Sequence, residues 1–210
     1  MLLFSLKNVG FKDIIHYPDI EIPEGCATFI SGESGSGKST LLKLLNGVLS
    51  ADDGEILYAG KPIDAYDPVT LRRDVLLCGQ SAYLFEGSVA QNFEEFYRYR
   101  DLPAPGAGLT HRYLKICAAD FTLESACATM SGGEKQRVFT AICLSFMPRA
   151  LLLDEPTSAL DDATANTLMA NMTAFCNKNG ITLIVVSHNQ QLLGTFADQI
   201  ISLAGGSRLE

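Results

Sequence analysis

One segment constrains the fold of this 210-residue chain more than any other: Gly32-Glu33-Ser34-Gly35-Ser36-Gly37-Lys38-Ser39-Thr40. It has the spacing Gly-x-x-x-x-Gly-Lys-Ser of a phosphate-binding loop, in which glycines let the backbone wrap closely around phosphate groups. Backbone N–H groups and the start of the following helix then face the anion. We expect Lys38 to reach the β and γ phosphates, Ser39 to bind Mg²⁺, and Glu33 to point away from the phosphates.

The surroundings of this loop are those of an α/β protein. An apolar strand is expected at 27–31 before the loop, and leucines at helical spacing predict a helix at 39–48 after it. The elements expected elsewhere are strands at 2–9, 19–22, 54–59, 75–78, 150–153, 181–187 and 199–203, and helices at 132–147 and 162–178. Strands that alternate with helices favour a mostly parallel sheet.

The pattern changes between residues 88 and 130. Ser88 is expected to cap a helix that runs through Asn92, prolines and glycines at 103–108 interrupt it, and a second helix is expected at 110–119. We therefore predict a single domain over 1–210, with a core at 1–87 and 131–210 and a small inserted helical subdomain at about 88–130.

Two carboxylates follow the apolar run at 150–153, namely Asp154 and Glu155. Ligands bind at the carboxyl ends of parallel strands, and where the chain turns at a strand tip both side chains can serve one site. We expect Asp154 to help hold Mg²⁺. Glu155 is placed to orient an attacking water or to accept its proton.

A second helix start carries glycines, in the run Ser131-Gly132-Gly133-Glu134. Ser131 can cap this helix, and Glu134 completes a capping box three residues later, which explains the pattern structurally. A helix start with two exposed glycines is also a second anion-binding site. The residues alone leave both explanations open.

Composition and sequence pattern argue against several classes of protein. The net charge is −8 and the sequence pI is about 4.9, which argues against a wide nucleic-acid contact. Residues 1–10 do not have the pattern of a signal peptide, and no apolar stretch approaches the roughly 20 residues of a membrane span. The six scattered cysteines fit small buried side chains in a reducing cytosol better than metal ligands or disulfides.

Taken together, the motifs resemble those of the nucleotide-binding domains of ATP-binding-cassette (ABC) transporters over essentially the whole chain. The motifs are the loop at 32–40, Gln80 in Leu77-Cys78-Gly79-Gln80, the signature Ser131-Gly132-Gly133-Glu134, the run Leu152-Leu153-Asp154-Glu155-Pro156-Thr157, the loop Ser158-Ala159-Leu160-Asp161, and His188 in Val185-Val186-Ser187-His188. Other phosphate-loop families lack the Ser-Gly-Gly-Glu signature. The resemblance implies a P-loop NTPase fold with a mostly parallel core, an antiparallel β subdomain and an inserted helical subdomain.

The resemblance also implies ligands and partners. These are ATP and Mg²⁺, a second copy of the ATPase subunit, and a separately encoded transmembrane permease, with the chain in the cytoplasm on the inner face of the membrane. ATP binding would draw two copies together around two ATP molecules, and hydrolysis would separate them. The movement would reach the permease through the helical subdomain. No nucleic-acid partner is expected.

Residue roles carry over from the same resemblance. Glu155 would be the catalytic carboxylate, assisted by His188, Gln80 and Lys38, while Ser39, Gln80 and Asp154 would hold the metal. The signature residues 131–134 would bind ATP held by the partner subunit, and residues 158–161 would lie at the subunit interface.

Two positions depart from the family pattern. Met130 replaces the usual leucine, a swap that conserves volume. The family stacks adenine on an aromatic residue from an early strand, but the expected position falls near Asp13, which cannot stack. Phe11 is the nearest aromatic candidate for the adenine contact.

The type of transporter and two rival functions stay open. Residues 83–92 resemble an exporter-like segment, and residues 146–149 resemble those of small bacterial ABC ATPases implicated in metal export, particularly of iron; an amino-acid, peptide or lipid system is equally compatible. One rival is a soluble ABC ATPase acting on nucleic acid or ribosomes, although only 93 residues separate Lys38 from Ser131, which leaves no room for a long coiled coil. The other rival is a non-catalytic cassette, against which the intact Lys38, Glu155 and His188 argue.

Overall fold

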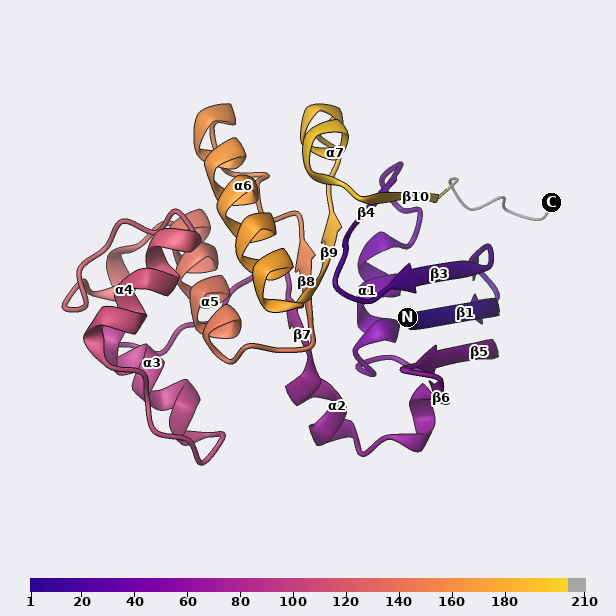
Figure 1. Ribbon diagram of the computed structural model, residues 1–210, viewed down its shortest axis with the longest axis horizontal. Helices are drawn as coiled ribbons and strands as arrows, with labels where there is room; N and C mark the ends of the chain where they lie inside the picture. Colours follow the sequence, from indigo (N-terminus) through magenta and orange to yellow (C-terminus); the bar gives the residue numbers. More distant parts are fainter. Residues whose placement is uncertain (204–210) are drawn as a thin grey trace.

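The computed structural model describes residues 1–203, which form two five-stranded sheets and the helices around them (Figure 1). One sheet has the order β10-β4-β9-β8-β7, with every neighbouring pair parallel. Its strands are β4 (Ala27–Gly32), β7 (Val75–Cys78), β8 (Ala150–Asp154), β9 (Thr182–Val186) and β10 (Gln199–Leu203). The predicted parallel core is confirmed.

The second sheet is antiparallel, and all of its strands lie within the first 62 residues. Its order is β2-β1-β5-β6, and β3 also pairs with β1. Its strands are β1 (Leu2–Phe11), β2 (Ile15–His16), β3 (Ile20–Pro23), β5 (Asp53–Tyr58) and β6 (Lys61–Pro62). The predicted antiparallel β part is therefore confirmed, although β2 and β6 were not expected from the sequence.

The strands of the parallel sheet are apolar on both faces because a separate core covers each face. In β8, Leu151 and Leu153 belong to one buried cluster, whereas Leu152 belongs to the other. The second cluster lies between the two sheets and includes the leucines of α1 (Lys38–Leu45). Helix α1 lies between the sheets in Figure 1, so the segment after the phosphate loop is anchored on both sides.

The remaining large helices pack on the other side of the parallel sheet. They are α3 (Val89–Arg98), α4 (Ala107–Ile116), α5 (Gly132–Ser145), α6 (Asp162–Asn179) and α7 (Gln190–Phe196). In Figure 1, α3 and α4 lie farthest from the antiparallel sheet, beyond α5 and α6. Ser88 caps α3, as predicted, through a capping box with Gln91.

Several predicted helix boundaries were wrong by a few residues. The helix expected at 110–119 is α4 at 107–116; it ends early because Ala118 has a left-handed φ of 49°. The helix expected at 132–147 ends at Ser145, and Met147 has a φ of 50°. The helix expected at 39–48 ends at Leu45, where Asn46 and Gly47 follow with a φ of 66° at the glycine.

One helix, α2 (Pro68–Asp74), was missed. The side chain of Asp67 caps it by accepting a hydrogen bond from Thr70 N at 2.8 Å, and Pro68 occupies its first position. Two short 3-10 turns were also missed, at Ile63–Ala65 and Cys127–Thr129. An Asp-Pro pair before a short apolar pattern is a recognised helix start, and this signal could have revealed α2.

Within residues 1–203, no helix has both the length and the apolar character that a membrane span requires. The six cysteines are free, and all but the half-buried Cys26 are buried. This matches their expected character as small core residues.

Candidate nucleotide-binding and hydrolysis site

Four neighbouring parallel strands deliver candidate residues to one edge of the sheet. In the order β4-β9-β8-β7, their ends carry the phosphate loop, His188, the pair Asp154 and Glu155, and Gln80. The strands pair in register, with Ile30 opposite Val186, Val186 opposite Asp154, and Leu153 opposite Cys78. Because parallel strands end at the same edge, residues far apart in the sequence converge there.

The phosphate loop has the backbone that its glycines allow. Gly37 has a φ of 89° at the start of α1, in the left-handed region that favours glycine. There is no room for a side chain at Gly32, where a Cβ atom would lie 2.4 Å from the carbonyl oxygen of Leu203. Lys38 Nζ donates to Gly32 O at 2.9 Å and to Glu33 O at 2.7 Å, and thus holds the loop in a closed arc. Glu33 is exposed.

Two buried oxygen atoms at this edge have no hydrogen-bond partner within the described residues. They are Ser36 Oγ in the loop and Asp154 Oδ1 at the end of β8. Asp154 is only 6% exposed. Its burial raises the pKa of its carboxyl group, and the Ser39 hydroxyl partly opposes that rise. An unpartnered carboxylate oxygen beside a hydroxyl is a suitable setting for a small divalent cation.

Glu155 and His188 form a direct contact. His188 Nε2 lies 3.1 Å from Glu155 Oε1, with about half of the histidine side chain and a quarter of the glutamate side chain exposed. Both residues line a small cavity of about 260 Å³ together with Thr157, Ser158 and Leu160. Glu155 has a φ of 52°, an uncommon conformation for a residue with a side chain.

Gln80 is exposed, two residues beyond the end of β7. The preceding carbonyl, Gly79 O, accepts a hydrogen bond from the buried Gln136 Nε2 of α5 at 3.4 Å. The loop of Gln80 is therefore tied to the helix that begins with the signature residues. Gln136 was not identified from the sequence, because a glutamine inside a helix gives no specific signal.

The signature residues form the predicted capping box. Glu134 Oε2 accepts from Ser131 N and from Ser131 Oγ, each at 2.7 Å, and these bonds lower the pKa of the Glu134 carboxyl group. Ser131 and Gly132 are exposed. Gly133 faces the loop at 158–161, because a Cβ atom there would lie 3.3 Å from Ala159 Cβ. The signature and that loop therefore meet within one chain.

The loop at 158–161 is fixed at both ends. Ser158 Oγ donates to Glu155 O at 3.1 Å, and Asp161 caps α6 by accepting from Thr164 N at 2.9 Å. Hydrogen bonds from Thr164 lower the pKa of Asp161. This loop joins the candidate catalytic carboxylate to the contact with Gly133.

The residues around the start of α1 include two that sequence reasoning missed. Tyr17 Oη donates to Gly37 O at 2.8 Å, and Ile15 Cγ2 would lie 3.0 Å from a Cβ atom at Gly37. Phe11 pairs with Ile15 across the β1–β2 turn and is half-buried. The ring of Phe11 also has Lys12 Nζ 5.4 Å from its centre. No motif in the sequence marks Tyr17.

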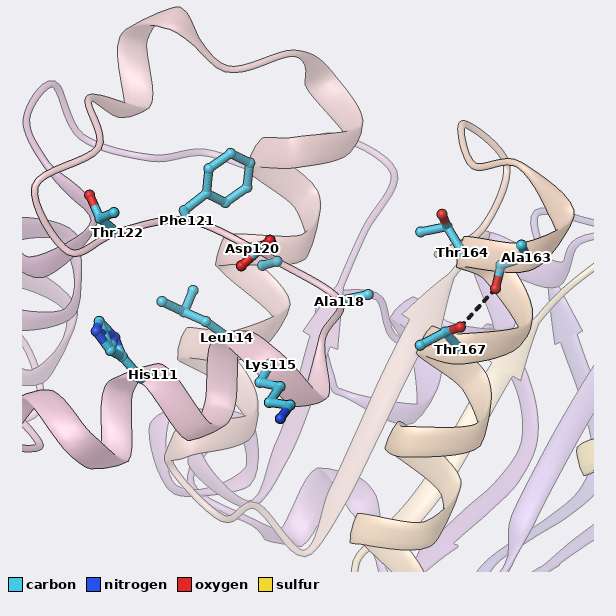
Figure 2. Close-up of a pocket in the computed structure, with 11 residues that line it drawn as sticks. His111, Leu114, Lys115, Ala118, Asp120, Phe121, Thr122, Ala163, Thr164 and Thr167 are labelled. Carbon is cyan, nitrogen blue, oxygen red and sulfur yellow. Dashed lines mark hydrogen bonds between the residues drawn. The ribbon is translucent and has the colours of Figure 1, made fainter.

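A larger cavity of about 850 Å³ lies away from these residues (Figure 2). It opens between α4, the following segment at 118–122 and the first turns of α6. Figure 2 shows Phe121 and Asp120 on one side and Thr164 and Thr167 on the other. None of the predicted site residues lines it, so cavity size does not locate the phosphate site in this chain.

Comparisons with known proteins agree with the geometry. The family model described as "ABC transporter" matches residues 15–158. The probable iron export ATP-binding protein FetA of Escherichia coli is 31% identical over 205 residues, covering 96% of this chain and 91% of FetA. The phosphonates import ATP-binding protein PhnC of Thiobacillus denitrificans is 32% identical, covering 90% of this chain and 76% of PhnC.

A similar solved structure is a dimer of the ATP-binding cassette MJ0796 in a post-hydrolysis state with ADP and Pi. Its TM-score is 0.82 at 28% identity, covering 97% of this chain and 95% of that chain. By sequence, family model and fold, the chain belongs to the ABC transporter family as an ATP-binding subunit.

Proposed function

We propose that this chain hydrolyses ATP with Mg²⁺ in a dimer whose two sites each use residues from both subunits. The observation that carries the proposal is the convergence of the phosphate loop, Asp154, Glu155 and His188 at the ends of adjacent strands. In this arrangement residues 32–40 cradle the phosphates, and Lys38 exchanges its carbonyl partners for the β and γ phosphates.

The residues suited to hold Mg²⁺ are Ser39, Asp154 and Gln80. Support comes from the buried, unpartnered Asp154 Oδ1 and from the Ser39 hydroxyl, which acts to lower the pKa of the Asp154 carboxyl group. Gln80 lies beyond the strand next to β8. The bound ion supplies positive charge to the phosphate oxygens, which offsets the charge that develops as the terminal phosphate is transferred.

Glu155 is the proposed general base, and His188 the proposed contact of the γ-phosphate. Glu155 Oε1 can accept a proton from a water molecule held in the cavity that it lines with His188. The 3.1 Å contact lets His188 orient the carboxylate while its own ring faces the cavity. Both side chains remain partly exposed, as a site that admits water and nucleotide requires.

The other half of each site comes from the partner subunit in this proposal. Ser131, Gly132, Gly133 and Glu134 begin α5, and an exposed helix N-terminus suits the γ-phosphate of ATP bound by a second copy. Residues 158–161 would then lie at the subunit interface. The dimeric cassette MJ0796 supports this arrangement.

For adenine, the surface near the start of α1 offers Phe11 as the aromatic candidate. Phe11 is half-buried and packs against the core between the two sheets, and Ile15 lies opposite it. Ile15 is also close to Gly37. This apolar pair can cover one face of a base, in place of the aromatic stack that Asp13 cannot make.

The membrane partner would bind the face around Gln80. Tyr83 and Tyr99 are 67% and 61% exposed, and Phe85 packs between them with ring centres 5.2 Å and 5.9 Å away. Exposed aromatic clusters of this kind favour protein–protein contacts. We propose that residues 88–130 act as a helical subdomain that, with this aromatic face, contacts a separately encoded permease and holds the chain on the inner face of the membrane.

The cargo would be selected by the permease. FetA is named for iron export and covers nearly the full length of both chains, which supports a metal ion as the cargo and export as its direction. PhnC is named for import of phosphonates. Growth in excess iron tests the assignment: loss of the chain together with its permease should lower iron tolerance, and unchanged tolerance would argue for another cargo.

The biochemical test is phosphate release from ATP by the purified chain. We expect Mg²⁺-dependent release that is lost on chelation and in Lys38→Ala. Release that persists in Lys38→Ala would place the chemistry elsewhere. Purification of the native chain bound to ribosomes or DNA, with no membrane protein, would favour the soluble alternative.

A further inference from the structure

The loop of Gln80 is held at both ends by buried side-chain amides. We define this loop as residues 79–87, between β7 and the Ser88 cap of α3. At its start, Gln136 of α5 donates to Gly79 O. Near its end, Asn92 of α3, which is completely buried, binds Phe85. Between these two anchors the chain is largely exposed, including Gln80 itself.

Asn92 makes four contacts with its one side chain. Its Oδ1 accepts from Phe85 N at 2.8 Å, and its Nδ2 donates to Phe85 O at 3.1 Å. The same nitrogen is 3.0 Å from Ser88 O and 3.4 Å from Cys127 Sγ. The amide therefore satisfies both backbone groups of Phe85 and also reaches the segment before the signature, in a buried setting where such bonds are costly to lose.

The segment that Asn92 reaches leads directly into the signature. Cys127 N donates to Gly87 O at 2.8 Å, and Val89 N donates to Ser125 O at 3.0 Å, so residues 87–89 pair with residues 125–127. Cys127 stands four residues before Ser131, and Met130 N donates to Cys127 O at 3.3 Å. The loop of Gln80 is thus connected to the signature by two routes, through Asn92 and Cys127, and through Gln136 in α5.

We propose that Asn92 and Gln136 are positioning residues that transmit movement of the signature residues to the loop of Gln80 in the same subunit. The proposal rests on the dimeric function above, in which the signature binds ATP held by the partner. When the partner's ATP draws Ser131 and Gly133 toward it, the amide anchors displace the loop at Gly79 and Phe85. Each subunit's Gln80 therefore responds to nucleotide in the opposite site, and the two sites are coupled.

A single fluorescent reporter can follow this movement, because the chain contains no tryptophan. Tyr83 suits Tyr83→Trp, since it is 67% exposed and its ring contacts Phe85, the residue that Asn92 holds. The experiment uses the full chain with Tyr83→Trp and Glu155→Gln, the second change to prevent turnover. Fluorescence and molecular mass are measured together as Mg²⁺ and ATP are added.

Formation of the ATP-bound dimer should shift the emission of the introduced indole. With Asn92→Ala added, the dimer should still form but the emission shift should be lost. The matched control is Tyr97→Phe. Tyr97 is buried on the same helix, and its hydroxyl donates to Ser145 O at 2.9 Å and to Ser145 Oγ at 3.1 Å in α5, away from residues 79–87 in sequence. This control should keep the full shift.

A dimer with an unchanged emission shift in Asn92→Ala would overturn the proposal. If Asn92→Ala does not fold or does not dimerise, Gln136→Met decides in the same assay: a lost or reduced shift supports the proposal, and a full shift overturns it. If the Tyr83→Trp, Glu155→Gln protein without further changes binds ATP but never dimerises, the dimeric function is refuted instead. If that protein dimerises without any shift in indole emission, the coupling between the signature and the loop of Gln80 is overturned and the dimeric function stands.

Discussion

Glu155 and His188 are held together by the backbone as well as by their side chains. Glu155 Oε1 lies 3.1 Å from His188 Nε2, and Glu155 N donates to Val186 O at 3.1 Å. Val186 is the last residue of β9, two positions before His188. The turn that carries the carboxylate is therefore bound to the strand that carries the histidine, which keeps the pair aligned without nucleotide.

This alignment predicts a selective loss of chemistry. Glu155→Gln keeps the shape of the side chain but removes the proton acceptor, so we expect ATP turnover to fall by about 10²- to 10⁴-fold while ATP binding persists. Phosphate release and nucleotide affinity measure the two effects. Glu55→Gln is a matched control at an exposed carboxylate of β5 and should keep normal turnover. Normal turnover in Glu155→Gln would remove this residue from the mechanism.

The ionised carboxylate of Asp154 should destabilise the folded protein when no nucleotide is bound. Burial raises the pKa of its carboxyl group, so folding favours the protonated form, and the ionised form destabilises the protein above that pKa. We expect Asp154→Asn to raise the melting temperature at pH 7, by about 2–4 °C for each kcal/mol relieved. The gain should shrink as the pH falls toward the pKa of about 3.9 that Asp has in an unfolded chain.

Calorimetry of both proteins between pH 4 and pH 8 tests the prediction for Asp154, with Asp120→Asn as the control at an exposed carboxylate. A lower melting temperature for Asp154→Asn at pH 7 would mean that the carboxylate has a stabilising partner in the free protein. Asp154→Asn should also weaken the dependence of ATP turnover on Mg²⁺.

Tyr17 should stabilise the conformation of the phosphate loop. Its buried hydroxyl donates to Gly37 O at 2.8 Å, so Tyr17→Phe removes one hydrogen bond at the start of α1. We expect a loss of about 1 kcal/mol of stability and a several-fold higher KM for ATP with nearly unchanged kcat. Tyr66→Phe is the matched control, because Tyr66 Oη also donates to a backbone carbonyl at 2.8 Å, that of Tyr58. An equal KM effect in both variants would refute a specific role for Tyr17.

The contact between Gly133 and Ala159 predicts a compensating pair. A Cβ atom at Gly133 would lie 3.3 Å from Ala159 Cβ, which is tighter than ordinary contact. Gly133→Ala should therefore shift the start of α5 and weaken ATP-driven dimerisation, and adding Ala159→Gly should restore part of it. Dimer mass as a function of ATP concentration provides the measurement. No restoration in the double variant would mean that Gly133 is needed for contact with the partner and not for space within its own chain.

The sequence predicted those parts of the site that rest on short motifs. Residues 32–40 carry their conformation in their glycines, and the capping box of Ser131 and Glu134 is a local pattern, so both could be identified from the order of the residues alone. The strands ending at Cys78 and Leu203 were placed correctly because four or five consecutive residues of strand character lie between clear turn signals.

Contacts between distant segments could not be predicted in this way. Tyr17 reaches Gly37 across 20 residues, and Gln136 reaches Gly79 across 57 residues, without any periodicity that relates them. Helix α4 was misplaced because its end depends on the left-handed Ala118, and alanine gives no warning of that conformation. Each site motif is therefore recognisable from a short segment of sequence, whereas the contacts that bring the motifs together and support them depend on the tertiary fold.

The central claim is that each ATP site is completed by a second copy of the chain, and the mass of the Glu155→Gln protein tests it most directly. With Mg²⁺ and ATP, light scattering should give about twice the 22.7 kDa of one chain, and without ATP it should give one chain. Adding Ser131→Arg should return the mass to that of one chain while ATP still binds. The mass of a single chain at saturating ATP would contradict the claim that a second copy completes each site. A dimer that still forms with Ser131→Arg would contradict it as well.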